Sequence, residues 1–361
     1  MKTKVDEILE KVILSRDDII FLLSTTDAAE RDKIYKKAYD VKNRIVGNKV
    51  YLRGLIEFSN ICKNNCYYCG IRHDNKKIER YALSDKEVLD AIEFSWKNKF
   101  VSIVIQSGER NNKDFVERID NILKKAKKIT NNEIGITLSV GEQTEETYKR
   151  WFESGAHRYL LRIEASNKEL FKKIHPNDNN HSFENRLKAL ENLKKTGYQT
   201  GTGVMIGMPF QTIEDLADDL LFMKNFDIDM VGMGPFIEHK DTPLFKYSNL
   251  LMSKQERLNL TLNMIAVLRI MMKDINIAST TALHSIDNLE VDSGLIAGAN
   301  VIMPNVTPMK NRLDYFLYDN KSVIDACSDE YLESLKKSII LAGDEIGFDK
   351  WGDSKHFLNR N

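Results

Sequence analysis

The chain alternates between two hydrophobic patterns: short continuous apolar runs and longer stretches with apolar residues at helical spacing. The runs at residues 50–58 and 101–106 are bounded by polar residues, which predicts buried strands. The stretch 85–97 repeats apolar residues every three or four positions, which predicts a helix with one buried face. Further strands are predicted at 134–139, 158–163, 199–206, 230–233, 275–279 and 301–303, and further helices at 114–129, 144–153, 182–196, 212–225 and 254–272.

Strands that alternate with helices are typical of an α/β fold with a parallel sheet, and eight such units predict a complete (β/α)8 barrel of the TIM type. An incomplete barrel of six strands is the competing architecture, because the last two apolar runs are the weakest. We expect an N-terminal helical cap at 1–48 and the barrel at 49–310. Residues 311–361 are expected to form a C-terminal helical extension that closes the barrel.

Three of the four cysteines, Cys62, Cys66 and Cys69, lie in the loop that leaves the first predicted strand. Three thiolates at this spacing can hold three irons of a four-iron, four-sulfur cluster, which leaves the fourth iron open to another molecule. Zinc bound by the three thiolates and His73 is an alternative. A disulfide is disfavoured, because the chain is poor in cysteine and three thiols cannot all pair.

Polar or glycine residues follow six of the predicted strands. In a parallel barrel the carboxyl ends of all strands open on one face, where active sites are built, and the cysteine loop opens on the same face. We therefore expect these residues to surround one site. They are Gln106, Ser107 and Gly108 after the second strand, Thr137 and Ser139 in the third, Arg162 and Glu164 after the fourth, Met205 in the fifth, Thr280 and Thr281 after the seventh, and Asn305 and Thr307 after the eighth.

The composition argues against several classes of partner. Lys plus Arg and Asp plus Glu both number 53 among 361 residues, so a zero net charge gives no reason to expect nucleic acid or an anionic membrane surface. The first residues carry no apolar run, and no stretch approaches the roughly 20 apolar residues that span a bilayer. We expect a cytoplasmic protein with a hydrophobic core, since 42% of the residues are hydrophobic.

The cysteine spacing, with the aromatic Tyr68 before the last cysteine, resembles the signature of radical S-adenosylmethionine (radical SAM) enzymes. The resemblance implies one [4Fe-4S] cluster on Cys62, Cys66 and Cys69. The fourth iron would chelate S-adenosylmethionine, and one electron would release a 5′-deoxyadenosyl radical. It also implies contacts to S-adenosylmethionine from Tyr68, Gln106, Ser107, Gly108, Thr137 and Ser139, from Glu164 to the ribose, from Arg162 and Arg186 to the carboxylate, and from Met205 in the strand that shelves the adenine.

A narrower resemblance joins the chain to the HydE family of [FeFe]-hydrogenase maturases. The matching motifs lie between about residues 45 and 320, at 56–60, 70–75, 106–109, 138–142, 158–162, 182–186, 229–236 and 299–305. The family implies a substrate in which iron carries carbon monoxide, cyanide and cysteine, and whose cysteine sulfur is adenosylated. Its implied partners are the companion maturase HydG and an electron donor, ferredoxin or flavodoxin. The resemblance implies substrate contacts from Thr280, Thr281, Asn305, Thr307 and Tyr318, with Tyr315 and Tyr318 closing the lower end of the cavity.

The chain departs from that family's pattern in two places. The family often reads Arg-His-Glu-Thr where this chain has Arg162-Ile163-Glu164-Ala165. Some members carry a second cluster on three further cysteines, whereas only Cys327 remains here, so we expect one cluster and a semi-buried thiol at Cys327. The alternatives are a methylornithine synthase-like mutase, a biotin synthase-like sulfur-insertion enzyme, for which further cysteines are missing, and a non-enzymatic carrier of zinc or an iron–sulfur cluster.

Overall fold

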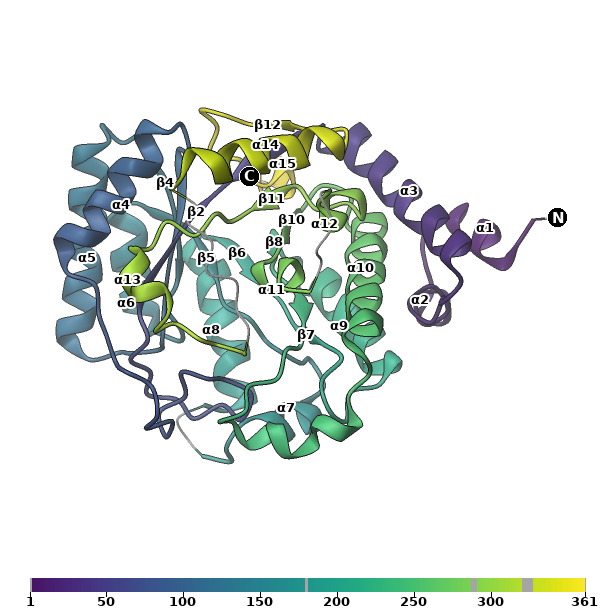
Figure 1. Ribbon diagram of the computed structural model, residues 1–361, viewed down its shortest axis with the longest axis horizontal. Coiled ribbons are helices and arrows are strands. Elements are labelled where there is room, and N and C mark those ends of the chain that lie inside the picture. The colour runs from purple at the N-terminus through teal and green to yellow at the C-terminus, as the bar shows by residue number, and fades with distance from the viewer. Residues whose placement is uncertain (1, 179–180, 287–290, 320–326, 361) are drawn as a thin grey trace.

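The core of the molecule is a curled parallel sheet (Figure 1). The structure, a computed structural model, describes residues 2–178, 181–286, 291–319 and 327–360. The strand order is β12-β1-β11-β10-β8-β6-β5-β4-β3-β2. The strands are β1 (Lys49–Leu52), β2 (Gly54–Ser59), β3 (Ser102–Ser107), β4 (Gly135–Ser139), β5 (Ala156–Leu160), β6 (Gln199–Thr202), β8 (Met230–Val231), β10 (Asn276–Ser279), β11 (Val301–Ile302) and β12 (Glu345–Ile346), with a separate parallel pair of β7 (Met205–Ile206) and β9 (Gly234–Pro235).

β2, at one end of this strand order, and β1, next to the other end, belong to one segment of chain. β1 and β2 are separated only by Arg53, yet β1 pairs with β11 and β2 pairs with β3. The Leu55 N–H donates to the Pro304 carbonyl oxygen at 2.7 Å, and the Val306 N–H donates to the Leu55 carbonyl oxygen at 2.9 Å. Each of the eight predicted strand segments contains a strand, because each is an apolar run buried between the interior and the outer helices. Two of them are interrupted: 50–58 is divided at Arg53, and 199–206 is divided into β6 and β7.

Helices that follow the strands cover the outside of the sheet (Figure 1). Their first turns are fixed by capping boxes such as Ser84 with Glu87 and Ser253 with Glu256. α10 is buried on most of its surface, because N-terminal helices pack on its outer side. The principal covering helices are α4 (Asp85–Lys97), α5 (Lys113–Ile129), α6 (Glu145–Glu153), α8 (Phe183–Thr196), α9 (Ile213–Asn225) and α10 (Lys254–Met271); shorter elements are α7 (Lys168–Ile174), the 3-10 helix η1 (Pro243–Leu250), α11 (Thr281–His284), α12 (Ser293–Ile296) and α13 (Met309–Arg312).

The N-terminal helices lie beside the barrel rather than across one of its ends. They are α1 (Lys4–Leu9), α2 (Arg16–Leu23) and α3 (Ala28–Ile45), and α2 and α3 pack against the outer helices α9 and α10 (Figure 1). These contacts therefore do not support the expected position of the N-terminal helices as a cap over one end of the barrel. Among the described helices, none has both the length and the apolar character needed to cross a membrane.

Residues 347–354 run across the amino-terminal ends of the strands. The Gly352 carbonyl oxygen accepts hydrogen bonds from the side chains of Arg53 (3.0 Å) and Asn276 (2.8 Å). Arg158, fully buried, donates to the Trp351 carbonyl oxygen at 2.9 Å and to the Asp353 carboxylate at 2.8 Å. The C-terminal part also contains α14 (Asp329–Leu341), α15 (Lys355–Arg360) and β12, a strand that the sequence did not predict.

Candidate active site

The cysteines lie on the loop that leaves β2, and side chains within this loop brace it. The Arg80 guanidinium donates to the carbonyl oxygens of Asn60 (2.6 Å), Ile71 (2.7 Å) and Arg72 (2.6 Å). The Asn60 side chain donates to the Glu79 carbonyl oxygen at 2.7 Å. These bonds satisfy the polar backbone of an irregular loop and define its course around the thiols.

All three cysteine side chains line one cavity of about 300 Å³ at the carboxyl ends of the strands. The Cys62 Sγ accepts hydrogen bonds from the N–H groups of Asn64 (3.4 Å) and Glu109 (3.3 Å). Burial raises the pKa of the Cys62 and Cys66 thiols and raises the pKa of Cys69 to about 12. Thiolates are the ligand form, so bound iron would supply the positive charge that these buried sulfurs need. Three thiols on one cavity, with amide donors at one sulfur, fit a cluster with three cysteine ligands.

Gly108 allows the loop after β3 to pack directly on the cysteine loop. A Cβ at this position would lie 2.5 Å from the Ile61 carbonyl oxygen and 2.8 Å from the Cys62 Cβ. The contact is reinforced by a hydrogen bond from the Lys63 N–H to the Glu109 carbonyl oxygen at 2.9 Å. The predicted motif around Gly108 therefore touches the cysteine loop itself.

His73 does not take part in this site. Its side chain is exposed, and its Nδ1 lies 3.0 Å from the Asp74 carboxylate. Because His73 does not line the cavity, the structure does not support the alternative of zinc bound by the three cysteines and His73. Two buried histidines lie nearer the thiols. Ligand atoms of Cys66, His175 and His181 fall within 4.8 Å of one another.

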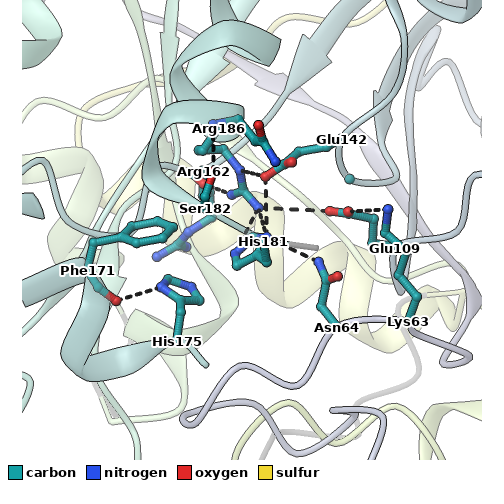
Figure 2. A network of polar contacts seen from close by, with 12 residues as sticks. Lys63, Asn64, Glu109, Glu142, Arg162, Phe171, His175, His181, Ser182 and Arg186 are labelled. Carbon is teal, nitrogen blue, oxygen red and sulfur yellow. Dashed lines mark hydrogen bonds and ion pairs between the residues drawn. The ribbon is translucent and has the colours of Figure 1, made fainter. Parts of the chain in front are cut away.

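Arg186 of α8 is the centre of a buried polar network beside the cysteines (Figure 2). Its Nε donates to Glu142 Oε1 at 2.7 Å, and an Nη2 nitrogen lies 3.3 Å from the His181 ring and 3.9 Å from Glu109 Oε2. A further hydrogen bond reaches the Arg162 carbonyl oxygen. The nearby guanidinium and His181 lower the pKa of Glu142 to about 2 despite its burial, and the carboxylates raise the pKa of Arg186. Arg186 is thus fixed in the cavity wall as a permanent cation.

Glu164 faces the same cavity from a strained backbone. It has φ +64°, a conformation that residues with a Cβ rarely adopt. Its N–H donates to the Gly203 carbonyl oxygen at 3.0 Å, and its carbonyl oxygen accepts from the Met205 N–H at 3.4 Å. The Arg162 Nη2 lies 2.9 Å from Glu164 Oε2, so an ion pair sits at the cavity surface. Such outliers are typical of positions held for function.

Most of the predicted site residues line this one cavity, but three do not. Thr137 lies lower in the barrel, where its hydroxyl accepts from Arg158 Nε at 3.0 Å beside a separate cavity of about 20 Å³. The Thr307 hydroxyl accepts from the Glu57 N–H at 2.8 Å, and the Asn305 side chain donates to the Glu57 carboxylate at 3.0 Å. These three side chains do not line the cavity and bond to protein groups instead, so the structure gives no support to their predicted ligand contacts. Those on the cavity are Cys62, Cys66, Tyr68, Cys69, Gln106, Ser107, Gly108, Ser139, Arg162, Glu164, Arg186, Met205, Thr280, Thr281, Tyr315 and Tyr318.

Glu57 and His181 are cavity residues that reasoning from strand ends missed. Glu57 points inward from the middle of β2 and His181 comes from a loop; both line the cavity, as does Glu109 at the end of the 106–109 motif. Glu57 lay inside the motif at 56–60, so a charged residue within an apolar run was the available signal. His181 had no sequence pattern that placed it beside the thiols. Cys327 is half-buried against the core, as predicted.

Comparisons with known proteins agree with this geometry. Residues 56–223 match the radical SAM superfamily. The [FeFe] hydrogenase maturase subunit HydE of Thermotoga maritima is 42% identical over 352 residues, 97% of each chain. The 3-methylornithine synthase of Methanosarcina acetivorans is 30% identical over 312 residues, 86% of this chain and 84% of that protein.

Two solved structures share the fold. Methylornithine synthase (PylB) has a TM-score of 0.77 and 25% identity, covering 96% of this chain and 98% of that one. The maturase HydG from Carboxydothermus hydrogenoformans also has a TM-score of 0.77, at 19% identity, covering 99% of this chain and 82% of that one, a likeness of fold alone. Three findings agree: the cavity with its three thiols, the match to the radical SAM superfamily, and the 42% identity to HydE over nearly the whole chain. The chain is therefore a radical SAM enzyme and belongs to the HydE family.

Proposed function

We propose that this protein is a maturase of [FeFe]-hydrogenase that adenosylates the cysteine sulfur of an iron complex bearing carbon monoxide and cyanide. The observation that carries the proposal is the 42% identity to HydE over 97% of this chain, together with one cavity that is lined by the three cysteines and by polar side chains. HydG would supply the complex, and ferredoxin or flavodoxin would supply the electron.

The three cysteines would hold one [4Fe-4S] cluster as its protein ligands. When bound, that cluster supplies the electron that cleaves S-adenosylmethionine to methionine and a 5′-deoxyadenosyl radical. Burial lowers the pKa of Arg80, and the nearby Cys62 and Cys69 act in the opposite direction. The Arg80 cation therefore lies close enough to the thiolates to offset their charge. The amide donors at Cys62 orient that sulfur.

The remaining cavity wall would bind S-adenosylmethionine and the iron complex. Glu164 would accept the ribose hydroxyls, Arg162 and Arg186 would attract the methionine carboxylate, and Met205 would support the adenine. Burial raises the pKa of Tyr318 to about 12, so its hydroxyl stays protonated. With the Thr281 hydroxyl it would donate hydrogen bonds to an anionic complex, whereas the Thr280 hydroxyl, also on the cavity, donates to the Met233 carbonyl oxygen at 3.3 Å. The Gln106 Nε2 donates to the Tyr315 hydroxyl at 3.4 Å and holds that ring in place at the cavity wall.

The proposal extends to the architecture. We place a helical segment at 1–48, a complete (β/α)8 barrel at 49–310 and a closing extension at 311–361. The shared segment of β1 and β2 supports a closed barrel, and the contacts of residues 347–354 support closure of its amino-terminal end. We place the protein in the cytoplasm, where a reducing environment keeps the ligand thiols free of disulfides.

The test is anaerobic reconstitution with iron and sulfide, followed by two assays. Reduction with S-adenosylmethionine should release 5′-deoxyadenosine products, which a carrier of zinc or clusters would not form. In a cell-free mixture with HydG, the third maturase and unmatured hydrogenase, hydrogen evolution should depend on this protein. Formation of 3-methylornithine, with no support of hydrogenase maturation, would instead favour the mutase alternative raised by the 3-methylornithine synthase relative.

A further inference from the structure

A glutamine just before α9 fastens the loop that carries Met205. The Gln211 Oε1 accepts hydrogen bonds from the N–H groups of Gly207 (2.7 Å) and Met208 (3.2 Å), and its Nε2 donates to the Met205 carbonyl oxygen at 2.9 Å. One side chain therefore satisfies three main-chain groups of a single tight loop. Gly207 has φ +80°, so this loop turns sharply where the glutamine grips it.

Two carboxylates of α9, four residues apart and so on the same side of the helix, fasten a second loop. Asp219 Oδ1 accepts from the Ser166 N–H (2.7 Å) and from the Ser166 hydroxyl (2.6 Å). Asp215 Oδ1 accepts from the Asn167 side chain at 2.6 Å. Asp219 is 1% exposed, and its Oδ2 has no hydrogen-bond partner among the described residues. Burying a carboxyl group costs free energy, so we infer that the hydrogen bonds of Asp219 to Ser166 serve a purpose that offsets this cost.

The two fastened loops carry two neighbouring parts of the cavity wall. Ser166 follows Glu164 by two residues, and Met205 is bonded to Gln211 directly. The loops are also joined to each other, because the Met205 N–H donates to the Glu164 carbonyl oxygen and Glu164 bridges to Val204. Glu164 holds its strained φ of +64° only where its surroundings fix it. Ser166 on one side is held by Asp219 of α9, and the adjoining Met205 is held by Gln211 just before α9.

We propose that Gln211, Asp215 and Asp219 form a positioning clamp that holds Glu164 and Met205 against the adenosyl half of S-adenosylmethionine. None of the three lines the cavity, so they act through the two loops rather than by touching the nucleoside. The inference rests on the proposed contacts of Glu164 and Met205. It is independent of the maturase assignment, because any radical SAM reaction in this cavity would need the nucleoside held.

The experiment uses the full chain with Gln211→Ala, Gln211→Glu and Ser166→Ala. Glu214→Ala is the matched control, since Glu214 is an exposed residue in the first turn of the same helix. Titration calorimetry of reconstituted protein measures the Kd for S-adenosylmethionine. Gln211→Ala should raise this Kd about tenfold, as expected when an interaction worth one or two hydrogen bonds is lost. Gln211→Glu keeps an oxygen that can accept from both N–H groups and loses the donor to the Met205 carbonyl oxygen, so its Kd should fall between those of wild type and Gln211→Ala.

A second readout needs neither cluster nor activity. In cluster-free protein, amide hydrogen exchange at Gly207 and Met208 should accelerate in Gln211→Ala and stay at the wild-type rate in Glu214→Ala. Iron content should be equal in all variants, and the KM for S-adenosylmethionine should rise more than kcat falls.

Accelerated exchange with an unchanged Kd would overturn the proposal, because Gln211 would then serve only local folding. If Gln211→Ala fails to fold, Ser166→Ala decides: it removes one hydrogen bond to Asp219, and an unchanged Kd there would overturn the clamp. Wild-type protein that cleaves S-adenosylmethionine without supporting hydrogenase maturation would refute the maturase proposal and leave this test intact.

Discussion

Replacing Gly108 with alanine should displace the cysteine loop and reduce cluster loading. The new Cβ would lie 2.5 Å from the Ile61 carbonyl oxygen and 2.8 Å from the Cys62 Cβ, and real Cβ contacts are essentially never that short. Neither neighbour is the end of a flexible side chain, so the two loops must separate. Separation breaks the hydrogen bonds from the Lys63 N–H to the Glu109 carbonyl oxygen (2.9 Å) and from the Glu109 N–H to the Cys62 Sγ (3.3 Å).

The magnitude follows from these two losses. Overpacking typically costs 1–3 kcal/mol and a lost hydrogen bond about 1 kcal/mol, so we expect about 3 kcal/mol against the loop arrangement that holds the cluster. That corresponds to about a hundredfold fall in the population competent to bind iron. The penalty is local to two loops at the carboxyl ends of the strands, so the barrel itself should remain folded.

The assay is iron and sulfide content after anaerobic reconstitution, with the visible absorption of the cluster as a second measure. Gly232→Ala is the matched control, because Gly232 lines the same cavity but an added Cβ would meet its nearest neighbour, a Leu160 methyl carbon, at an ordinary 3.5 Å. Thermal unfolding of both variants checks the fold. Wild-type iron content in Gly108→Ala would refute the reasoning that close packing of these loops defines the site.

Three further predictions concern single side chains. Cys66→Ser should abolish cleavage of S-adenosylmethionine under dithionite, measured as 5′-deoxyadenosine, because a cluster with two thiolate ligands is not retained. Glu164→Ala should weaken S-adenosylmethionine binding by about tenfold while the cluster's visible absorption stays intact; a colourless variant would contradict a ribose role. Burial raises the pKa of Asp219 to about 7, above its unfolded value, so the carboxyl lowers stability as pH rises from about 4 to about 7 and the penalty persists above that. Urea unfolding should therefore show Asp219→Asn more stable than wild type at about pH 8, by up to about 4 kcal/mol, with the difference shrinking toward about pH 5; a difference independent of pH would count against a buried, neutral carboxyl.

The strands and principal helices were predictable because each is a local pattern of apolar residues. The positions that line the cavity were predictable only in part. Thr137 and Ser139 both point into the barrel, two residues apart on β4, but depth separates them: Arg158 takes the Thr137 hydroxyl in the lower layer, while Ser139 reaches the cavity. The alternation of residues along a strand predicts whether a side chain points into the barrel. It does not predict whether that side chain lies at the level of the cavity or in the lower layer, where other side chains occupy the interior.

Contacts between distant segments explain the remaining misses. Arg80 stabilises the cysteine loop by donating to its main-chain carbonyl oxygens. Because every residue type has a carbonyl oxygen, no sequence pattern in the loop could have identified Arg80 as their partner. Thr307 seemed suited to a ligand, yet its hydroxyl accepts from the Glu57 N–H of the adjacent strand β2. Residues 347–354 have no periodic pattern, so their course under the strands could not be read from the sequence. Such pairings are set by tertiary geometry and leave no local signature.

The course of residues 347–354 has a consequence for how the molecule is made. Two arginines that are synthesised early, Arg53 between β1 and β2 and Arg158 of β5, donate to acceptors on Trp351, Gly352 and Asp353. During translation, those buried cations must wait for some two hundred or more later residues to leave the ribosome, so the floor of the barrel matures last. Nascent chains halted before this stretch should remain open to proteases and reliant on chaperones.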